Sequence, residues 1–389
     1  MPAPDLRAAV ALALGAAISL GLARFSYALM LPPMRADLDW SYFTAGAMNT
    51  ANAAGYLVGA LLAPRALARH DARGLLLAGA WGTAALLALH GLVRSDLAMY
   101  ALRLLSGVAS AATFISGGLL AARLGQSAQA RPALILGLYY GGTGAGIIAS
   151  ALLVPPLAER IAPPGWPLAW LALAALALLA TFAMARGTRG LAAPPAGAVP
   201  HGSAFRWRVF AYGLAGYLLF GLGYIGYMTF IVTLLREQGA GQGTVIAFYI
   251  VLGAGVIASS WLWAPLLQRY RGGQPMALLN GLIALATVLP VWSAHPVAVF
   301  TSGALFGAVF LSVVASTTAL VRHNLPLAAW PGGIAAFTIV FAAGQIVGPS
   351  LVGWVADGQG GLVRGLSVSA GVLALGALLA WRQAALPVR

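Results

Sequence analysis

Two arginines lie inside long apolar stretches of this chain, where a charged side chain needs a partner. Arg24 and Arg103 each fall about six or seven residues from the expected outer end of their segments, on the order of 10 Å deep at about 1.5 Å per residue. A guanidinium in hydrocarbon costs about 2.5–3.5 kcal/mol, and no Asp or Glu occurs within the predicted apolar segments. We therefore expect Arg24, together with Arg103, to bind the carboxylate of a small anion. Two alternatives stay open: Arg24 could extend to lipid headgroups, and Arg103 could donate to backbone carbonyls beside Gly107.

A polar stripe continues from Arg103. Ser106, Ser110 and Thr113 follow it at spacings of three, seven and ten residues, which places all four on one helix face. This stripe predicts a face toward a central site. The alternative is that each hydroxyl bonds to the carbonyl four residues earlier in its own helix and binds no ligand.

An aromatic stripe forms the counterpart in the second half of the chain. Tyr217, Phe220, Tyr224 and Tyr227 share a helix face. Helix packing explains such a stripe as readily as ligand stacking does, but phenol groups in lipid need hydrogen-bond partners. We also expect the following residues to contribute to substrate binding: Tyr27, Asn49, Asn52, Phe306 and Phe310.

Small residues recur in two further segments, and we expect them to form gates. Gly142 and Gly146 lie in one segment, and Gly344, Gly348 and Pro349 lie in the other. Small residues four apart let helix backbones approach closely. A proline removes one backbone hydrogen bond and allows a helix to bend.

The elements that carry these residues are predicted to be membrane-spanning helices. The chain is 61% hydrophobic and 8% charged, and a helix needs about 20 apolar residues to cross a bilayer. β-Barrel strands would alternate with a period of two, which this sequence does not. The predicted spans are 8–31, 43–64, 74–93, 97–121, 133–154, 166–186, 208–234, 244–266, 275–293, 297–321, 333–356 and 362–381. The predicted fold is all-α, with twelve transmembrane helices in two six-helix bundles.

Charge predicts the orientation. With the N-terminus inside, most loop arginines fall on the inner side, and most acids on the outer side. The positive-inside rule then predicts a bacterial inner-membrane protein with both termini in the cytoplasm. The net charge of +14 is explained by this topology, so we expect no nucleic-acid partner. The chain lacks cysteine, which excludes disulfides and thiolate metal sites.

The chain repeats itself about 200 residues apart. Gly21-Leu22 aligns with Gly221-Leu222, and Ala63-Pro64 aligns with Ala264-Pro265. A repeat of this length in a membrane protein is typical of transporters with two related halves around a shared site. The alignment places Arg24 opposite Tyr224. We expect an N-terminal bundle over 1–186, a cytoplasmic linker over 187–207 and a C-terminal bundle over 208–389.

The chain resembles the major facilitator superfamily over nearly its whole length. Arg103-Leu-Leu-Ser-Gly107 is similar to the family's R-x-x-x-G signature, and Gly344-Gln-Ile-Val-Gly348-Pro349 to its G-x-x-x-G-P motif. The loop from Gly59 to Arg73 resembles the Gly- and Arg-rich loop motif, with Pro64 near the position of the usual acid. The segment from Gly21 to Pro64 most resembles the bacterial YbfB/YjiJ-type branch. The resemblance implies alternating access and a cavity lined by spans one, four, seven and ten.

These features predict a secondary active or facilitative transporter for a small organic anion with an apolar or aromatic body, such as an aromatic carboxylate or an aromatic amino acid. The first alternative is a multidrug-type exporter of lipophilic compounds, and the second is a sensor derived from a transporter. An enzyme is disfavoured because no catalytic constellation lies at membrane depth. We expect a monomer that partners only its substrate and the lipid bilayer, without metal or cofactor.

Overall fold

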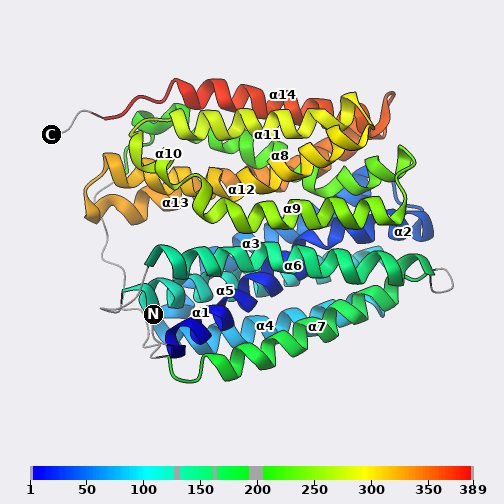
Figure 1. Cartoon of the computed structure of the whole chain (residues 1–389), viewed down its shortest axis with the longest axis horizontal. Helices are drawn as coiled ribbons and strands as arrows, with labels where there is room; N and C mark the ends of the chain where they lie inside the picture. Colours follow the sequence, from blue (N-terminus) through cyan, green and yellow to red (C-terminus); the bar gives the residue numbers. More distant parts are fainter. Residues whose placement is uncertain (1–2, 127–131, 161–163, 192–204, 387–389) are drawn as a thin grey trace.

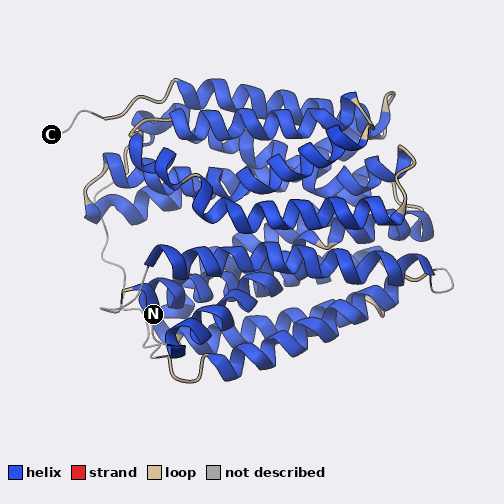
Figure 2. Cartoon of the chain, in the orientation of Figure 1, coloured by secondary structure: helices blue, strands red, loops and turns tan. Residues whose placement is uncertain are grey.

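The computed structural model describes residues 3–126, 132–160, 164–191 and 205–386, and helices account for nearly all of them. Figure 2 shows helices joined by short loops, with no strand in the part drawn in colour. In the first half the elements are α1 (Ala3–Ala16), η1 (Ala17–Phe25), α2 (Tyr27–Leu38), α3 (Tyr42–Arg69), α4 (Ala72–His90), α5 (Asp96–Gly125), α6 (Pro132–Arg160) and α7 (Trp166–Gly187).

The second half begins with a short 3₁₀ turn and repeats this order. Its elements are η2 (Trp207–Phe210), α8 (Ala211–Glu237), α9 (Gln242–Leu262), α10 (Ala264–Arg269), α11 (Gln274–Trp292), α12 (Pro296–Asn324), η3 (Leu327–Ala329), α13 (Trp330–Ala356) and α14 (Gly361–Trp381). Residues 192–204 of the predicted linker lie outside the described residues. We keep 1–186 and 208–389 as the proposed N-terminal and C-terminal halves.

The predicted all-helical membrane fold is confirmed. All twelve predicted spans fall on helices, and three of the spans are composite: α1, η1 and α2 form the first, η2 with α8 forms the seventh, and α9 with α10 forms the eighth. Eleven described helices are long and apolar enough to cross a bilayer. The twelfth, α3, has 28 residues but carries Asn49, Asn52 and several other polar side chains, which lower its hydropathy. The chain is therefore a multi-pass membrane protein.

Local capping fixes where several helices begin. The Ser41 hydroxyl accepts from the backbone N–H of Thr44 at 3.0 Å and starts α3. Asp71 accepts in the same way from Gly74 at 2.7 Å and starts α4. Asp71, the acidic residue of the Gly- and Arg-rich loop, thus serves as a helix cap.

The two halves lie side by side, with both chain termini at the left end of the view in Figure 1. We call this end the terminal face and the opposite end the distal face. The main helix pairs that join the halves are α3 with α13, α6 with α9, and α2 with α8, and α3 also contacts α8. The predicted central site would lie where these pairs meet.

The halves are closed toward the distal face. In α3, Gly46 approaches the backbone of Pro349, and the Thr50 hydroxyl donates to the Ile346 carbonyl at 2.6 Å. Leu61 and Ile339 lie on the same two stripes nearer to the terminal face, and they are 53% and 43% exposed. The α3 and α13 stripes that meet distally are therefore uncovered toward the terminal face.

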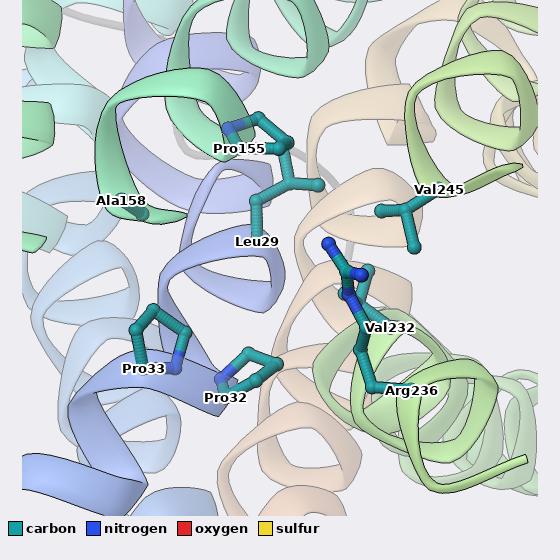
Figure 3. A pocket seen from close by; sticks show the side chains of 8 residues that line it. All are labelled: Leu29, Pro32, Pro33, Pro155, Ala158, Val232, Arg236 and Val245. Atoms are coloured by element: carbon teal, nitrogen blue, oxygen red, sulfur yellow. The ribbon is translucent and has the colours of Figure 1, made fainter. Parts of the chain in front are cut away.

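The space between the halves near the distal face is small. A cavity of about 20 Å³, room for roughly one water molecule, lies between α2, α6, α8 and α9 (Figure 3). Its lining residues are Leu29, Pro32, Pro33, Pro155, Ala158, Val232, Arg236 and Val245. The contacts of α3 with α13 and of α2 with α8 thus close the distal side of the interface in this conformation.

Candidate functional site

Arg24 lies in a stretch of π-helix, which the sequence did not predict. Nine residues, Ala17–Phe25, form this wider helix, and the backbone N–H of Ser26 donates to the carbonyl of Gly21, five residues back, at 3.2 Å. The Ser26 hydroxyl donates to the Leu22 carbonyl at 2.5 Å. π-Helical segments are rare and occur frequently at functional sites. This segment changes the direction in which Arg24 leaves the first membrane helix.

The Arg24 side chain is 5% exposed, so it does not extend to the headgroups. Its Nε and Nη2 atoms are buried and have no hydrogen-bond partner among the described residues. Its guanidinium carbon lies 5.5 Å from the centre of the Tyr56 ring, and Tyr224 lies within electrostatic range. A cation from the N-terminal half therefore lies over the Tyr56 ring and in the neighbourhood of Tyr224, and its Nε and Nη2 groups have no described partner.

Arg103 is equally buried, but each of its three guanidinium nitrogens donates a hydrogen bond. At 1% exposure, its Nη2 donates to the Asn49 side-chain oxygen at 3.0 Å, its Nη1 to the Ala23 carbonyl at 3.3 Å and its Nε to the Met48 carbonyl at 3.4 Å. Its guanidinium carbon also lies 4.4 Å from the centre of the Tyr27 ring. These are the backbone-type bonds that the sequence left open for Arg103, and direct substrate contact by Arg103 stays a prediction.

The two asparagines and Tyr27 join this network rather than pointing to a free space. Asn52 donates to the carbonyl of Arg103 at 3.1 Å, and the Tyr27 hydroxyl donates to the Ala45 carbonyl at 2.9 Å. Asn49 donates from Nδ2 to the Thr229 hydroxyl at 2.7 Å. Thr229 belongs to α8, so Asn49 bonds across the two halves.

The predicted aromatic stripe of α8 forms an extended stack. The Tyr217 ring lies 4.8 Å from Phe341, and the Phe220 ring lies 4.7 Å from Tyr224, in both cases nearly parallel. Tyr224 also stacks on Phe341 at 5.7 Å and on Phe310 at 6.1 Å. Offset stacks at such separations are favourable. The stack places a flat apolar surface beside Arg24 through Tyr224.

Tyr224 and Tyr227 have different environments although both lie on the stripe. The Nε2 group of Gln345 donates to the Tyr224 hydroxyl. Tyr227 instead pairs with the Ser302 hydroxyl at 2.6 Å and stacks on Phe306 at 4.2 Å. Tyr227 and Phe306 are fully buried. Phe310 connects the two groups and meets Phe25 of η1 edge-on at 5.6 Å.

The hydroxyl groups of the polar stripe on α5 also have different environments. Thr113 donates to the carbonyl of Ala109 at 3.0 Å, as the non-ligand alternative expects. The hydroxyls of Ser106 and Ser110 are buried and have no partner among the described residues. A bound water or ligand atom would satisfy them, and their substrate-binding role stays a prediction.

The gate candidates form close backbone contacts within each half. A Cβ on Gly142 would lie 2.0 Å from the Ala13 carbonyl oxygen, and a Cβ on Gly344 would lie 2.3 Å from the Leu218 carbonyl oxygen. Gly146 and Gly348 are packed against η1 and α8 in a similar way. Pro349 touches α3 across the halves. The two glycine rows are thus equivalent in the repeat, and their gating role stays a prediction.

Four contributors to the site were missed by the sequence reasoning. They are Tyr56, Phe341, Phe25 and Thr229, of which Tyr56 and Phe341 are partly exposed. Phe341 lies one helical turn from Gln345, and this spacing was the signal that could have identified it. Among the described residues no three His, Asp or Glu side chains gather in a way that would hold a metal ion.

Comparisons with known proteins agree with this architecture. Residues 16–381 match a family described as "Uncharacterised MFS-type transporter YbfB". No curated protein sequence matches the chain significantly.

Solved structures share the fold at low sequence identity. A point mutant of the nucleoside transporter NupG superposes with a TM-score of 0.78 at 15% identity, covering 97% of this chain and 99% of that one. A bacterial homologue of the human lysosomal transporter Spinster, in an inward-facing and occupied conformation, gives 0.75 at 12% identity, covering 98% and 97%. The human organic anion transporter MFSD10 (TETRAN) gives 0.65 at 16% identity, covering 98% and 100%.

Proposed function

Because the chain belongs to the YbfB-type family of major facilitator transporters, we propose that it carries a small organic anion with an aromatic body across the bacterial inner membrane. It does so by alternating access, as a secondary active or facilitative transporter, with both termini in the cytoplasm. It acts as a monomer and catalyses no covalent reaction.

One observation carries the choice of an anion. Arg24 is buried in a membrane helix with two guanidinium nitrogens unpaired among the described residues. Arg24 forms no ion pair with any described residue, and Arg103 adds a second positive charge nearby. Two buried cations without a carboxylate favour an anionic ligand, because an uncompensated charge in a membrane interior is costly.

The aromatic stack supports an apolar body on that anion. Tyr224, Phe341 and Phe310 present nearly parallel rings, and the internal repeat aligns Tyr224 with Arg24. A carboxylate on Arg24 would leave an attached ring beside these faces. Aromatic carboxylates combine the two chemistries, and aromatic amino acids do so if Tyr hydroxyls or carbonyls accept from the ammonium group.

The proposal is tested by ligand binding to the purified protein. Benzoate, phenylacetate, indole-3-acetate and tryptophan are compared with amide and amine analogues of the same rings, using thermal-shift and calorimetric titration. We expect saturable binding only for members that carry a free carboxylate, and loss of that binding in Arg24→Ala. Equal binding of the amide and amine analogues, or no binding by any carboxylate, contradicts the anion assignment.

A second candidate, an exporter of lipophilic compounds, is favoured by the same stack. Five aromatic rings, Tyr217, Phe220, Tyr224, Phe310 and Phe341, offer a surface that a neutral hydrophobic solute could occupy. Binding of such a solute should not depend on Arg24. Intact binding of a neutral lipophilic dye by Arg24→Ala, together with drug hypersensitivity of a deletion strain, would establish this function instead.

A further inference from the structure

We propose that Asn49 and Thr229 form a latch between the two halves, which ties the backbone next to Arg24 to closure of the distal face. The inference rests on the proposed function in one respect, that the two faces open in turn during transport. No ligand is needed for the latch itself. Neither residue belongs to the anion contact proposed above through Arg24 and Tyr224.

The hydrogen bonds have a fixed direction. A guanidinium can only donate, so the Asn49 atom that meets Arg103 Nη2 at 3.0 Å is the amide oxygen. The amide nitrogen therefore points to Thr229 and donates to its hydroxyl at 2.7 Å. That hydroxyl donates in turn to the Ile225 carbonyl at 2.6 Å. Donation runs from Arg103 through Asn49 and Thr229 to the backbone of α8.

Both ends of this series of hydrogen bonds, which we call the relay, reach the candidate site. At one end Arg103 Nη1 donates to the carbonyl of Ala23, the residue before Arg24. At the other end Ile225 directly follows Tyr224 in α8. Asn49 is 3% exposed and Thr229 is fully buried, so water does not compete for these bonds.

Opening of the distal face must break one link in particular. Arg103 and Asn49 both belong to the N-terminal half, and their bond survives when the halves separate. The bond from Asn49 to Thr229 crosses from α3 to α8, and separation leaves the Asn49 amide without its acceptor. A buried unpaired amide is unfavourable. The relay therefore favours the closed distal face and makes the segment around Ala23 sensitive to that closure.

A second contact across the interface provides a matched control. The Thr50 hydroxyl bonds to the Ile346 carbonyl at 2.6 Å and pairs with the Ser350 hydroxyl at 2.9 Å. It lies one residue from Asn49 on α3 and also joins the halves. No described hydrogen bond connects it to Arg103, so it tests interface loss without loss of the relay.

The test measures the distance between two spin labels, one on each half. Because the chain has no native cysteine, each label attaches only to an introduced cysteine. Spin labels on Leu92→Cys and Val297→Cys, which are 70% and 67% exposed at the distal face of the two halves, report its opening by double electron–electron resonance. Thr229→Val removes the hydroxyl at similar volume. We expect it to lower the ratio of closed to open protein about fivefold or more, and Thr229→Ser to restore it. An unchanged distance distribution in Thr229→Val overturns the latch, and Asn49→Ala repeats the test if Thr229→Val does not fold.

The link to Arg103 is tested separately with a double-mutant cycle on the same distances. Arg103→Lys and Thr229→Val should be non-additive, because one relay contains both residues. Arg103→Lys and Thr50→Val should be additive. Additivity in the first pair would show a local contact without the relay and would reject that part of the proposal. Because no ligand is present in either measurement, failure of the anion assignment leaves these outcomes unaffected.

Discussion

Arg103 Nη1 donates to the carbonyl oxygen of Ala23 at 3.3 Å, so that one buried arginine holds the peptide group that precedes the other, Arg24. The two cations are thus divided in role. Each of the three Arg103 nitrogens donates a bond within the N-terminal half, whereas Arg24 keeps two nitrogens free of any described partner. The division leads to distinct expectations for their variants.

Replacement of Arg24 should remove anion binding without unfolding the protein. Arg24→Ala and Arg24→Lys are both expected to raise the dissociation constant of an aromatic carboxylate at least about tenfold, because an ammonium cannot reproduce the bidentate guanidinium fork. Calorimetric titration of the purified variants measures this. Arg94→Ala, which removes a surface ion pair with Asp37, is the control and should bind normally. Unchanged affinity in folded Arg24→Ala would reject the assignment.

Replacement of Arg103 should act first on stability. Arg103→Ala removes the bonds to the Ala23 and Met48 carbonyls and leaves the Asn49 side-chain oxygen without a described donor, and such a buried unpaired group costs about 1–3 kcal/mol. We expect a clearly lower melting temperature in detergent, well below that of Arg24→Ala. A melting temperature equal to that of the parent would show that these bonds contribute little.

Variants of Tyr224 distinguish the contribution of its ring from that of its hydroxyl to ligand binding. An aromatic pair is worth about 0.5–1.5 kcal/mol beyond its buried area. Tyr224→Phe keeps the contacts with Phe220 and Phe341 and should weaken ligand binding less than Tyr224→Ala. If both variants lose affinity equally, the hydroxyl that accepts from Gln345 carries the contact. Titrations with one carboxylate ligand decide between the two outcomes.

Close packing of the glycine rows should be required for transport. Gly344→Ala would place its Cβ 2.3 Å from the Leu218 carbonyl oxygen, so α13 must move away from α8. We expect a large loss of uptake in proteoliposomes. Gly371→Ala in α14, where no atom lies within 4 Å of the added Cβ, is the matched control and should transport normally. Normal uptake by Gly344→Ala would remove this residue from the gate candidates.

Transport should not depend on a buried carboxylate relay. Proton coupling usually needs a group whose pKa changes between the access states, and the acids lie outside the predicted spans. Asp37 pairs with Arg94 at 2.9 Å and accepts from Trp166 at 2.9 Å near the distal face. Uptake under an imposed pH gradient should therefore persist in Asp37→Asn and Asp39→Asn. Gradient-driven accumulation that disappears in one of these variants would identify the relay.

The sequence alone determined the class, the helices and the equal depth of the two arginines. Helix length is set by the thickness of the bilayer, and this requirement acts on each segment separately, so composition was sufficient to place all twelve spans. The repeat predicted that the halves would present equivalent helices, and Gly142 and Gly344 do make equivalent contacts. Positions inside the spans placed Arg24 and Arg103 at one depth, and Arg103 does reach the carbonyl of Ala23, the residue before Arg24.

Only the tertiary structure decided which groups are paired. Arg24 and Arg103 look alike in sequence, but Arg103 meets three acceptors from η1 and α3, whereas Arg24 lies over the Tyr56 ring of α3 with two nitrogens unpaired among the described residues. Trp166 and Trp292 both lie at span ends, yet Trp166 is fully buried and Trp292 is 75% exposed. The bond from Asn49 to Thr229 likewise joins helices that are distant in sequence. Local pattern encodes length and polarity, but the partner of a buried polar group is chosen by the packing of the helices around it.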